Sequence, residues 1–285
     1  MSVRRRWIFA GAGTALLLAL AAIALRPGQP DRASGARLAG TENYLAGVAA
    51  DVYLPAHAGV APIVVLVPGG SWRSADRSGL WPLAELLAEH QIMAVTATYR
   101  VGSAQARFPT PVADIVCGID FAVQRAKSAG VRPGPVIVLG HSAGAQLAAL
   151  AALTGHRFAH GCPYAPACVD ALIGLSGAYE VMSLADLADA LFGVPAGQDP
   201  DLWRSGDPDT YAAQRPNLPA LLAHGAADTT LSATYTQTFA ARLTEAGHEV
   251  RVEIVPGATH STIYRPEVIG SRIVTWIAGL PASHC

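Results

Sequence analysis

The chain has 285 residues, of which 51% are hydrophobic, and its formal net charge is −1. A chain of this size buries a large core in one soluble domain, but it is too short for two ordinary enzyme domains with linkers. Positive and negative charges are interspersed and no basic stripe follows the first few residues. We therefore expect no nucleic-acid partner.

The N-terminus is typical of a targeting segment. Three arginines at positions 4–6 precede an uncharged, moderately hydrophobic run over 7–25, which is about long enough to span a bilayer. We expect residues 1–26 to be a signal peptide or a signal anchor, followed by a polar linker over 27–40. Cleavage after Ala-Ile-Ala at 22–24 and retention as an anchor both stay open.

Two further features bear on export. The arginine pair before Trp-Ile-Phe loosely resembles a twin-arginine signal, and no cysteine follows the apolar run as a lipoprotein would require. The expected location is the periplasm, the cell envelope or the medium, with membrane association through residues 7–25 as one alternative.

The four cysteines fit an exported protein. Cys162 and Cys168 bracket a short loop-like insert, and we expect them to form a local disulfide in an oxidising compartment. Cys117, on an expected helix, either pairs with the terminal Cys285 or is a buried free thiol, and the sequence leaves both alternatives open.

A metal site from His156, His160 and Cys162 is a weaker interpretation of the same region. The histidine spacing suits a helix end, but acidic residues are missing nearby. We favour surface histidines beside a disulfide, and we expect no metal or organic cofactor.

From residue 41 onward, strand-like and helix-like segments alternate. Strands are expected over 48–54, 63–67, 92–98, 136–139, 169–175, 220–223 and 250–255. Helices are expected over 80–89, 111–126, 142–153, 235–246 and 268–280. The alternation predicts an α/β domain over 41–285 with a mostly parallel, doubly wound sheet, in which the first strand, 48–54, is antiparallel.

Residues 179–218 interrupt this alternation. A short helix-like piece over 184–191 is followed by several Pro and Gly turn signals. We interpret the stretch as a small cap or pocket wall over the carboxyl ends of the strands, where ligands bind in such sheets.

The pentapeptide Gly-His-Ser-Ala-Gly at 140–144 lies between an expected strand and an expected helix. A sharp strand-to-helix turn crowds the backbone, and glycine at both ends relieves the crowding. This pattern predicts that the hydroxyl of Ser142 projects from the edge of the sheet as a nucleophile.

A serine nucleophile needs a histidine base, and the histidine needs a carboxylate that orients it. Asp228 and His260 each follow an expected strand, and they occur in the order acid, then histidine, that is expected after such a serine. They should therefore meet Ser142 at one edge of the sheet. His224 precedes the acid and is expected to be a packing residue.

The tetrahedral intermediate of acyl transfer needs N–H donors for its oxyanion. One donor is expected from the backbone of Ala143, at the start of the helix after the serine. The others are expected from Gly69 and Gly70, in the loop after the strand 63–67. Trp72 is either a pocket wall or a core anchor.

With these pieces in place, the chain resembles an α/β-hydrolase of the hormone-sensitive-lipase-like and arylformamidase-like (BD-FAE-type) esterase group. The resemblance is carried in family order, from about residue 43 to the end, by Pro68-Gly69-Gly70-Ser71-Trp72, Tyr99-Arg100, Phe108-Pro109 with Asp114, the pentapeptide 140–144, His224-Gly225 with Asp228, and Pro256-Gly257 with His260.

The resemblance implies ester hydrolysis through an acyl-enzyme, with Ser142, Asp228 and His260 as the triad. Tyr99, Arg100 and Asp114 match positions that look structural. One departure is that Pro68 stands where the family has histidine at the start of the oxyanion loop. Because proline has a fixed φ and no N–H, this loop is expected to be held differently, and an altered oxyanion hole is one consequence to consider.

The leading hypothesis is a serine carboxylesterase for small or medium esters. A hydrolase of amides, formamides or short peptides with the same triad is the alternative within enzymes. A catalytically silent hydrolase fold used for binding, and an anchoring protein of the cell envelope, are the alternatives from other classes. Acyl and alcohol specificity and oligomeric state stay open.

Overall fold

The computed structural model describes residues 37–103 and 106–282. The expected targeting segment 1–26, residues 27–36 of the expected linker, and Cys285 lie outside these residues. Within the described part of the chain, no helix is both long and apolar enough to cross a membrane.

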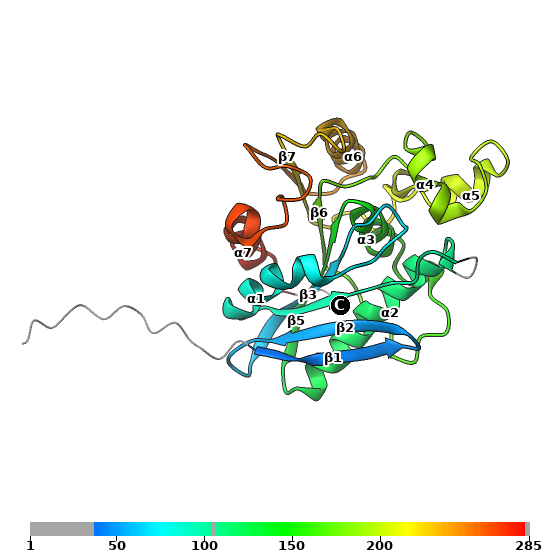
Figure 1. The fold of residues 1–285 in the computed structure, drawn as a ribbon. Coiled ribbons are helices and arrows are strands. Elements are labelled where there is room, and N and C mark those ends of the chain that lie inside the picture. Colours follow the sequence, from blue (N-terminus) through cyan, green and yellow to red (C-terminus); the bar gives the residue numbers. More distant parts are fainter. Residues whose placement is uncertain (1–36, 104–105, 283–285) are drawn as a thin grey trace, which may run out of the picture. The chain divides into compact units, whose positions relative to one another are not determined.

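Eight strands form one sheet in the order β1-β2-β4-β3-β5-β6-β7-β8 (Figure 1). They are β1 (Arg37–Leu45), β2 (Val48–Leu54), β3 (Val60–Val67), β4 (Met93–Ala97), β5 (Arg132–His141), β6 (Ala171–Leu175), β7 (Ala220–Gly225) and β8 (Val250–Val255). The pairs β1/β2 and β2/β4 are antiparallel and all other neighbours are parallel. The mostly parallel sheet and its antiparallel early strand are thus confirmed.

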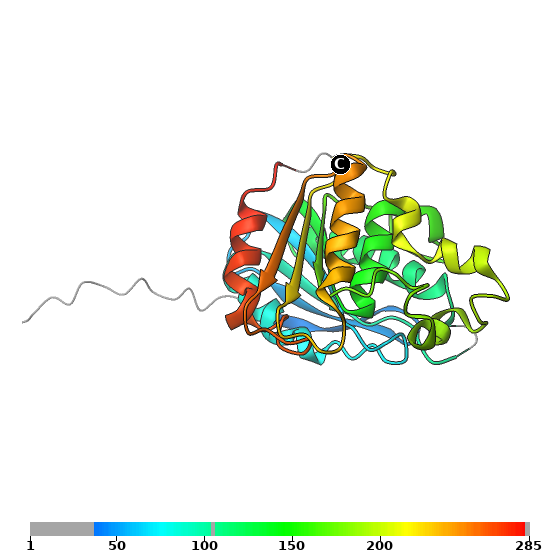
Figure 2. The ribbon, with the colours of Figure 1, turned by 90° about the horizontal axis from the view of Figure 1, so that it is seen from above.

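Helices cover both faces of the sheet (Figure 2). They are α1 (Trp81–Glu89), α2 (Thr110–Ser128), α3 (Ala143–Thr154), α4 (Ala185–Phe192), α5 (Pro200–Ser205), α6 (Ala233–Glu245) and α7 (Ser271–Ala278), with shorter turns η1 (Ser78–Leu80), η3 (Gly155–Phe158), η4 (Pro208–Tyr211) and η5 (Pro266–Gly270). The buried side chains of α1 and α7 pack on one face, and those of α2, α3 and α6 pack on the other. This is the doubly wound architecture that the alternation predicts.

The central strand β3 shows why the sheet is buried on both faces. Its residues from Ile63 to Val67 are all fully buried, as a continuous apolar run in a parallel strand requires. The strand ends are also in register, because Val67 pairs with Gly140 and His141 pairs with Leu175. Residues that follow β3 and β5 therefore emerge at the same edge of the sheet.

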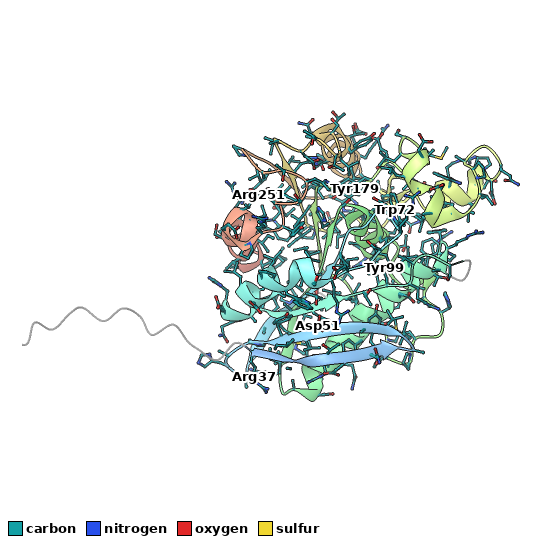
Figure 3. The ribbon with its side chains drawn as sticks, viewed as in Figure 1. Arg37, Asp51, Trp72, Tyr99, Tyr179 and Arg251 are labelled. Carbon is teal, nitrogen blue, oxygen red and sulfur yellow. A yellow bond between two sulfur atoms is a disulfide. The ribbon has the colours of Figure 1, made fainter. Side chains whose placement is uncertain are left out.

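Asp51 on β2 joins the antiparallel part of the sheet to the segment before α1. Asp51, labelled in Figure 3, is 2% exposed. Its carboxylate accepts hydrogen bonds from Arg77 Nε at 2.7 Å, Trp81 Nε1 at 2.7 Å, Thr41 Oγ1 at 2.5 Å and Thr96 Oγ1 at 3.3 Å. Burial raises the pKa of Asp51, but these hydrogen bonds and the Arg77 charge outweigh it and lower the pKa below its ordinary value. Asp51 is thus a structural anion, buried together with its counter-charge.

The stretch 179–218 contains α4, α5 and η4, all short. Their aromatic side chains point inward: Phe192 stacks on Trp203 with ring centroids 4.2 Å apart, and both residues belong to the core cluster that also holds α3. Phe108 packs against Phe192 at 5.7 Å. The expected insertion therefore packs onto the domain core through its aromatic side chains.

Two expectations about the chain need correction. β1 begins at Arg37, inside the stretch expected to be a linker, because Arg37 and Leu38 pair with Leu54 and Tyr53 of β2. The stretch is polar and contains Gly40, and a strand at the edge of a sheet needs backbone pairing on one side only. The expected domain boundary at residue 41 is therefore a few residues too late.

The expected cysteine pairing is also wrong. Cys117 on α2 is bonded to Cys162, whereas Cys168 is free and exposed. Neither the Cys162–Cys168 disulfide nor a Cys117–Cys285 pair is therefore present. Closeness in sequence misleads here because the fold brings Cys162, 45 residues further along the chain, against a buried position of α2.

We predict that peptide mapping of the protein, purified under oxidising conditions and not reduced, will find residues 117 and 162 in one cross-linked peptide pair. Cys168 should react with iodoacetamide before reduction, because its thiol is exposed. Cys117→Ala is expected to lower the free energy of unfolding by about 2–4 kcal/mol, measured by denaturant titration. Recovery of a 162–168 cross-link would contradict this assignment.

Candidate active site

Ser142 occupies the sharp turn between β5 and α3. Its φ of 54° and ψ of −122° lie outside the regions that residues with a side chain ordinarily adopt. The turn closes tightly, because a Cβ on Gly140 would overlap the carbonyl oxygen of Gly144, and one on Gly144 would overlap that of Pro68. Both flanking glycines are thus required by close approach, as the pentapeptide predicts.

Ser142, His260 and Asp228 meet in one hydrogen-bonded chain. Ser142 Oγ lies 2.9 Å from His260 Nε2, and His260 Nδ1 lies 2.8 Å from Asp228 Oδ2. Because the carboxylate accepts only, Nδ1 carries the proton and Nε2 is free to accept from the serine hydroxyl. This arrangement can remove a proton from Ser142 Oγ and stabilise the positive charge that develops on His260.

The Asp228 carboxylate is buried and held as an anion. Its Oδ1 accepts from the backbone N–H groups of Thr230 and Leu231, both at 2.9 Å, and its Oδ2 accepts from His260. Burial raises the pKa of Asp228, but the hydrogen bonds from Leu231 and His260 outweigh it and lower the pKa below its ordinary value. The carboxylate is therefore charged under the conditions in which His260 would act as a base.

His224 also lies near Asp228 but takes a different role. Its Nε2 donates to the carbonyl of Leu231 at 3.0 Å, and its Nδ1 lies 2.8 Å from Thr236 Oγ1. The side chain is fully buried, and burial lowers its pKa. His224 thus packs the end of β7, as expected from its place before the acid.

His141, next to the serine, supports the main chain of His260. Its Nε2 donates to the His260 carbonyl at 2.8 Å, and its ring packs against Tyr264 with centroids 4.7 Å apart. Burial is the main reason that the pKa of His141 is lowered to about 3, and the nearby His260 lowers it further. His141 is therefore neutral and adds no positive charge beside the base.

The loop after β3 approaches the serine closely. A Cβ on Gly69 would lie 2.8 Å from Ser142 Cβ and 2.9 Å from His141 Nδ1. Gly70 has a φ of 139°, and a side chain there would overlap the backbone of Ser74. Ala143 is the first residue of α3, so its N–H has no acceptor within the helix. Gly69 and Ala143 thus lie beside Ser142, and Gly70 follows Gly69 in the same loop.

Pro68 has no N–H to donate, but its carbonyl accepts a hydrogen bond that holds the start of the loop. The hydroxyl of the buried Tyr99 donates to the Pro68 carbonyl at 3.0 Å. At the next residue, Arg100 Nε donates to Asp114 Oδ2 at 2.9 Å, which ties the segment after β4 to α2. Tyr99, Arg100 and Asp114 are therefore structural, as the resemblance implies.

Of the two histidines beside the disulfide, His156 contacts a carboxylate and His160 contacts the backbone carbonyl of Phe158. His156 Nε2 lies 3.0 Å from the buried carboxylate of Asp120. Among residues 37–103 and 106–282, no group of three or more His, Cys, Asp or Glu side chains is arranged to hold a metal ion.

Sequence reasoning missed two residues near the site. The sequence pattern assigns no separate role to His141 within the pentapeptide, and it indicates only that Gln146 belongs to a helix. Gln146 is fully buried on α3 and bonds to Trp72, which is itself 2% exposed. Trp72 is thus a core anchor. The signal for Gln146 was an amide side chain in a run of Ala and Leu residues.

Comparison with known proteins agrees with this architecture. "Isoprenylcysteine alpha-carbonyl methylesterase ICME" of Arabidopsis thaliana is 28% identical over 231 residues, which cover 75% of this chain and 54% of the relative. "Esterase LipQ" of Mycobacterium tuberculosis is 26% identical over 214 residues, which cover 70% of this chain and 50% of the relative. The chain spans about half the length of the curated relatives it matches.

Solved structures share the fold. A truncated carbohydrate esterase from gut microbiota superposes with a TM-score of 0.73 at 18% identity, covering 88% of this chain and 97% of that protein. The butyrate-bound esterase Est2 of Thermogutta terrifontis has a TM-score of 0.68 at 22% identity, covering 86% and 92%. The α/β-hydrolase fold of the described domain is thereby confirmed.

The BD-FAE family matches residues 50–243, a range that holds the loop after β3, Ser142 and Asp228. Since this match spans more than half of the chain, the protein belongs to the BD-FAE family.

Proposed function

We propose that this protein is a serine carboxylesterase that hydrolyses small or medium carboxylic esters through an acyl-enzyme on Ser142. The observation that carries the proposal is the hydrogen-bonded chain from Ser142 through His260 to Asp228. Relatives named as esterases and as a methylesterase support the same reaction class.

The proposed reaction begins with attack of Ser142 Oγ on the ester carbonyl carbon while His260 Nε2 takes the hydroxyl proton. The tetrahedral oxyanion accepts hydrogen bonds from the N–H of Ala143 and from the loop at Gly69 and Gly70. Collapse breaks the bond to the alkoxy group, which leaves as the alcohol with the proton from His260. Water then attacks the acyl-enzyme by the same route and releases the carboxylic acid and free Ser142.

The preference for small or medium acyl groups is supported by the packing of the insertion 179–218. Its large aromatic side chains, Phe192 and Trp203, are buried in the core that they share with α3. Est2 of Thermogutta terrifontis, a structural neighbour, has been crystallised with butyrate and with propionate. Both observations favour short acyl chains for this protein.

The alternative with the same triad is hydrolysis of amides, formamides or short peptides. The geometry around Ser142 serves either bond, so the names of the relatives are what favours esters. A purely binding role is disfavoured because all three triad side chains are present and connected.

Export of the protein is part of the proposal. The Cys117–Cys162 disulfide supports an oxidising compartment, and the arginines and apolar run at 4–25 support a targeting segment. Membrane association through residues 7–25 remains the proposed alternative to cleavage. N-terminal sequencing of the mature protein distinguishes the two, because a cleaved protein begins after the apolar run.

Ser142→Ala is expected to lower hydrolysis of p-nitrophenyl acetate by about 10³-fold or more, because removing the nucleophile removes the acyl-enzyme route. A fluorophosphonate should label the Ser142 peptide of the parent, read by mass spectrometry. Ser183→Ala, which changes a serine that contacts Glu180 away from the triad, is the matched control. A parent that folds but neither hydrolyses esters nor is labelled would exclude the proposal.

Across p-nitrophenyl esters of increasing acyl length, kcat/KM is expected to be highest for acetate or butyrate and to fall toward palmitate. The physical reason is that Phe192 and Trp203, the large aromatic side chains of the insertion, are buried and present no aromatic surface to a long acyl chain. The same series with p-nitroanilides tests amide hydrolysis. Faster turnover of the palmitate ester would contradict the size preference, and faster turnover of the anilides would favour the amide alternative.

Gly69→Ala is expected to lower kcat by about 10²- to 10³-fold, the usual loss when one oxyanion donor is displaced. The added Cβ would lie 2.8 Å from Ser142 Cβ, so loop and nucleophile must separate. Gly59→Ala is the matched control, because a Cβ there meets nothing within 4 Å. Equal activity of the two variants would place the oxyanion donors elsewhere.

A further inference from the structure

Gln146 lies one turn into α3, behind the serine, and is completely buried. Its backbone N–H points back to the Ser142 carbonyl at 3.4 Å. Burying an amide side chain among apolar residues is unfavourable unless its polar atoms are bonded. The environment of Gln146 therefore has to supply partners for both ends of the amide.

Both ends are bonded, and to different parts of the site. Trp72 Nε1 donates to Gln146 Oε1 at 3.0 Å, and Gln146 Nε2 donates to the Gly206 carbonyl at 2.6 Å. An indole N–H only donates and a carbonyl only accepts, so the amide fits in one orientation. Gln146 thus joins the loop after β3, the helix after the serine, and the insertion.

The loop that Gln146 contacts has an unfavourable backbone conformation. Ser71 and Trp72, which follow Gly70 directly, have φ values of 51° and 56°. Residues with a side chain adopt such values at a cost, and they persist only where surrounding contacts impose them. The backbone turn is closed by the N–H of Arg73, which donates to the Gly70 carbonyl at 2.9 Å. The buried Trp72 side chain is anchored by its hydrogen bond to Gln146 and by packing in the core.

We propose that Gln146 is a positioning residue for the oxyanion loop: through Trp72 it holds Gly69 and Gly70 at a fixed position relative to Ser142. The inference rests on the proposed function, because it concerns how the proposed oxyanion site is placed. It also accounts for a loop that opens with Pro68, since Tyr99 holds the first residue of the loop and Gln146 holds the loop beyond the glycines.

The outer side of the same loop is tied to the insertion. Arg73 Nη2 lies 2.6 Å from Asp189 Oδ1, and Arg73 Nη1 donates to the Leu187 carbonyl at 3.1 Å. This ion pair is half exposed, with side-chain exposures of 48% and 60%, and such pairs contribute little. The buried bond to Gln146 is the one that we expect to determine the position of the loop.

The test replaces Gln146 by Met, which has a similar length and removes both hydrogen bonds. For p-nitrophenyl acetate, we expect kcat per fluorophosphonate-titrated active site to fall about tenfold or more, with KM changing less than about threefold. The reason is that a displaced oxyanion loop fails to stabilise the tetrahedral states of both acylation and deacylation. The affinity for a boronic acid, which forms a tetrahedral adduct with the serine, should fall by a similar factor.

A second variant separates positioning from folding. Trp72→Phe keeps an aromatic ring but lacks the indole N–H, and it should reproduce most of the loss in kcat. The kcat of the double variant should be no lower than that of the less active single variant, because both substitutions remove the same hydrogen bond. Gln124→Met, at an exposed glutamine of α2, is the matched control and should behave as the parent.

The outcomes divide cleanly. If the parent hydrolyses the ester and Gln146→Met retains kcat per active site, Gln146 does not position the loop, whatever its effect on the melting temperature. The same conclusion follows if the losses of the two single variants multiply in the double variant. If the parent neither hydrolyses the ester nor is labelled at Ser142, the proposed function falls and this inference falls with it.

Discussion

The turn at Ser142 is the constraint on which the rest of the site depends. A residue with φ of 54° and ψ of −122° does not persist on its own preference, so β5 and α3 must hold it from both sides. The N–H of Ser142 is fixed by the Leu175 carbonyl of β6, and Gly144 allows Val67 and Pro68 of the neighbouring strand end to pack against the turn. The Ser142 hydroxyl therefore has a fixed position relative to His260.

Electrostatics then assigns distinct states to the groups around that hydroxyl. Asp228 is kept as an anion by backbone N–H donors and His260, and it faces two histidines, of which His260 alone reaches Ser142. His141 and His224 are buried, and burial lowers the pKa of both, so they remain neutral. A positive charge that develops on His260 consequently has one carboxylate beside it and no cationic histidine.

The insertion takes part in this architecture through backbone contacts. Gly206 receives a hydrogen bond from Gln146, and the carbonyl of Leu187 receives one from Arg73. The packed aromatic interior around Phe192 and Trp203 gives these acceptors a firm position. The loop after β3 and the start of α3 are thereby linked to the short helices of the insertion.

The sequence by itself determined the fold class and pointed to the residues of the candidate triad. Apolar runs separated by helical stretches specify a parallel sheet, and Ser142, Asp228 and His260 each follow a strand, so the topology alone brings them to one edge.

Tertiary structure alone decided which residues from remote parts of the sequence are in contact. Cys162 bonds to Cys117 and not to the nearer Cys168, and β1 begins in a stretch that resembles a linker. The sequence pattern also gives no indication of the contacts of Gln146, since its partners Trp72 and Gly206 are separated from it by 74 and 60 residues. A hydrogen bond or disulfide depends on the final positions of two side chains, and local patterns carry no information on that.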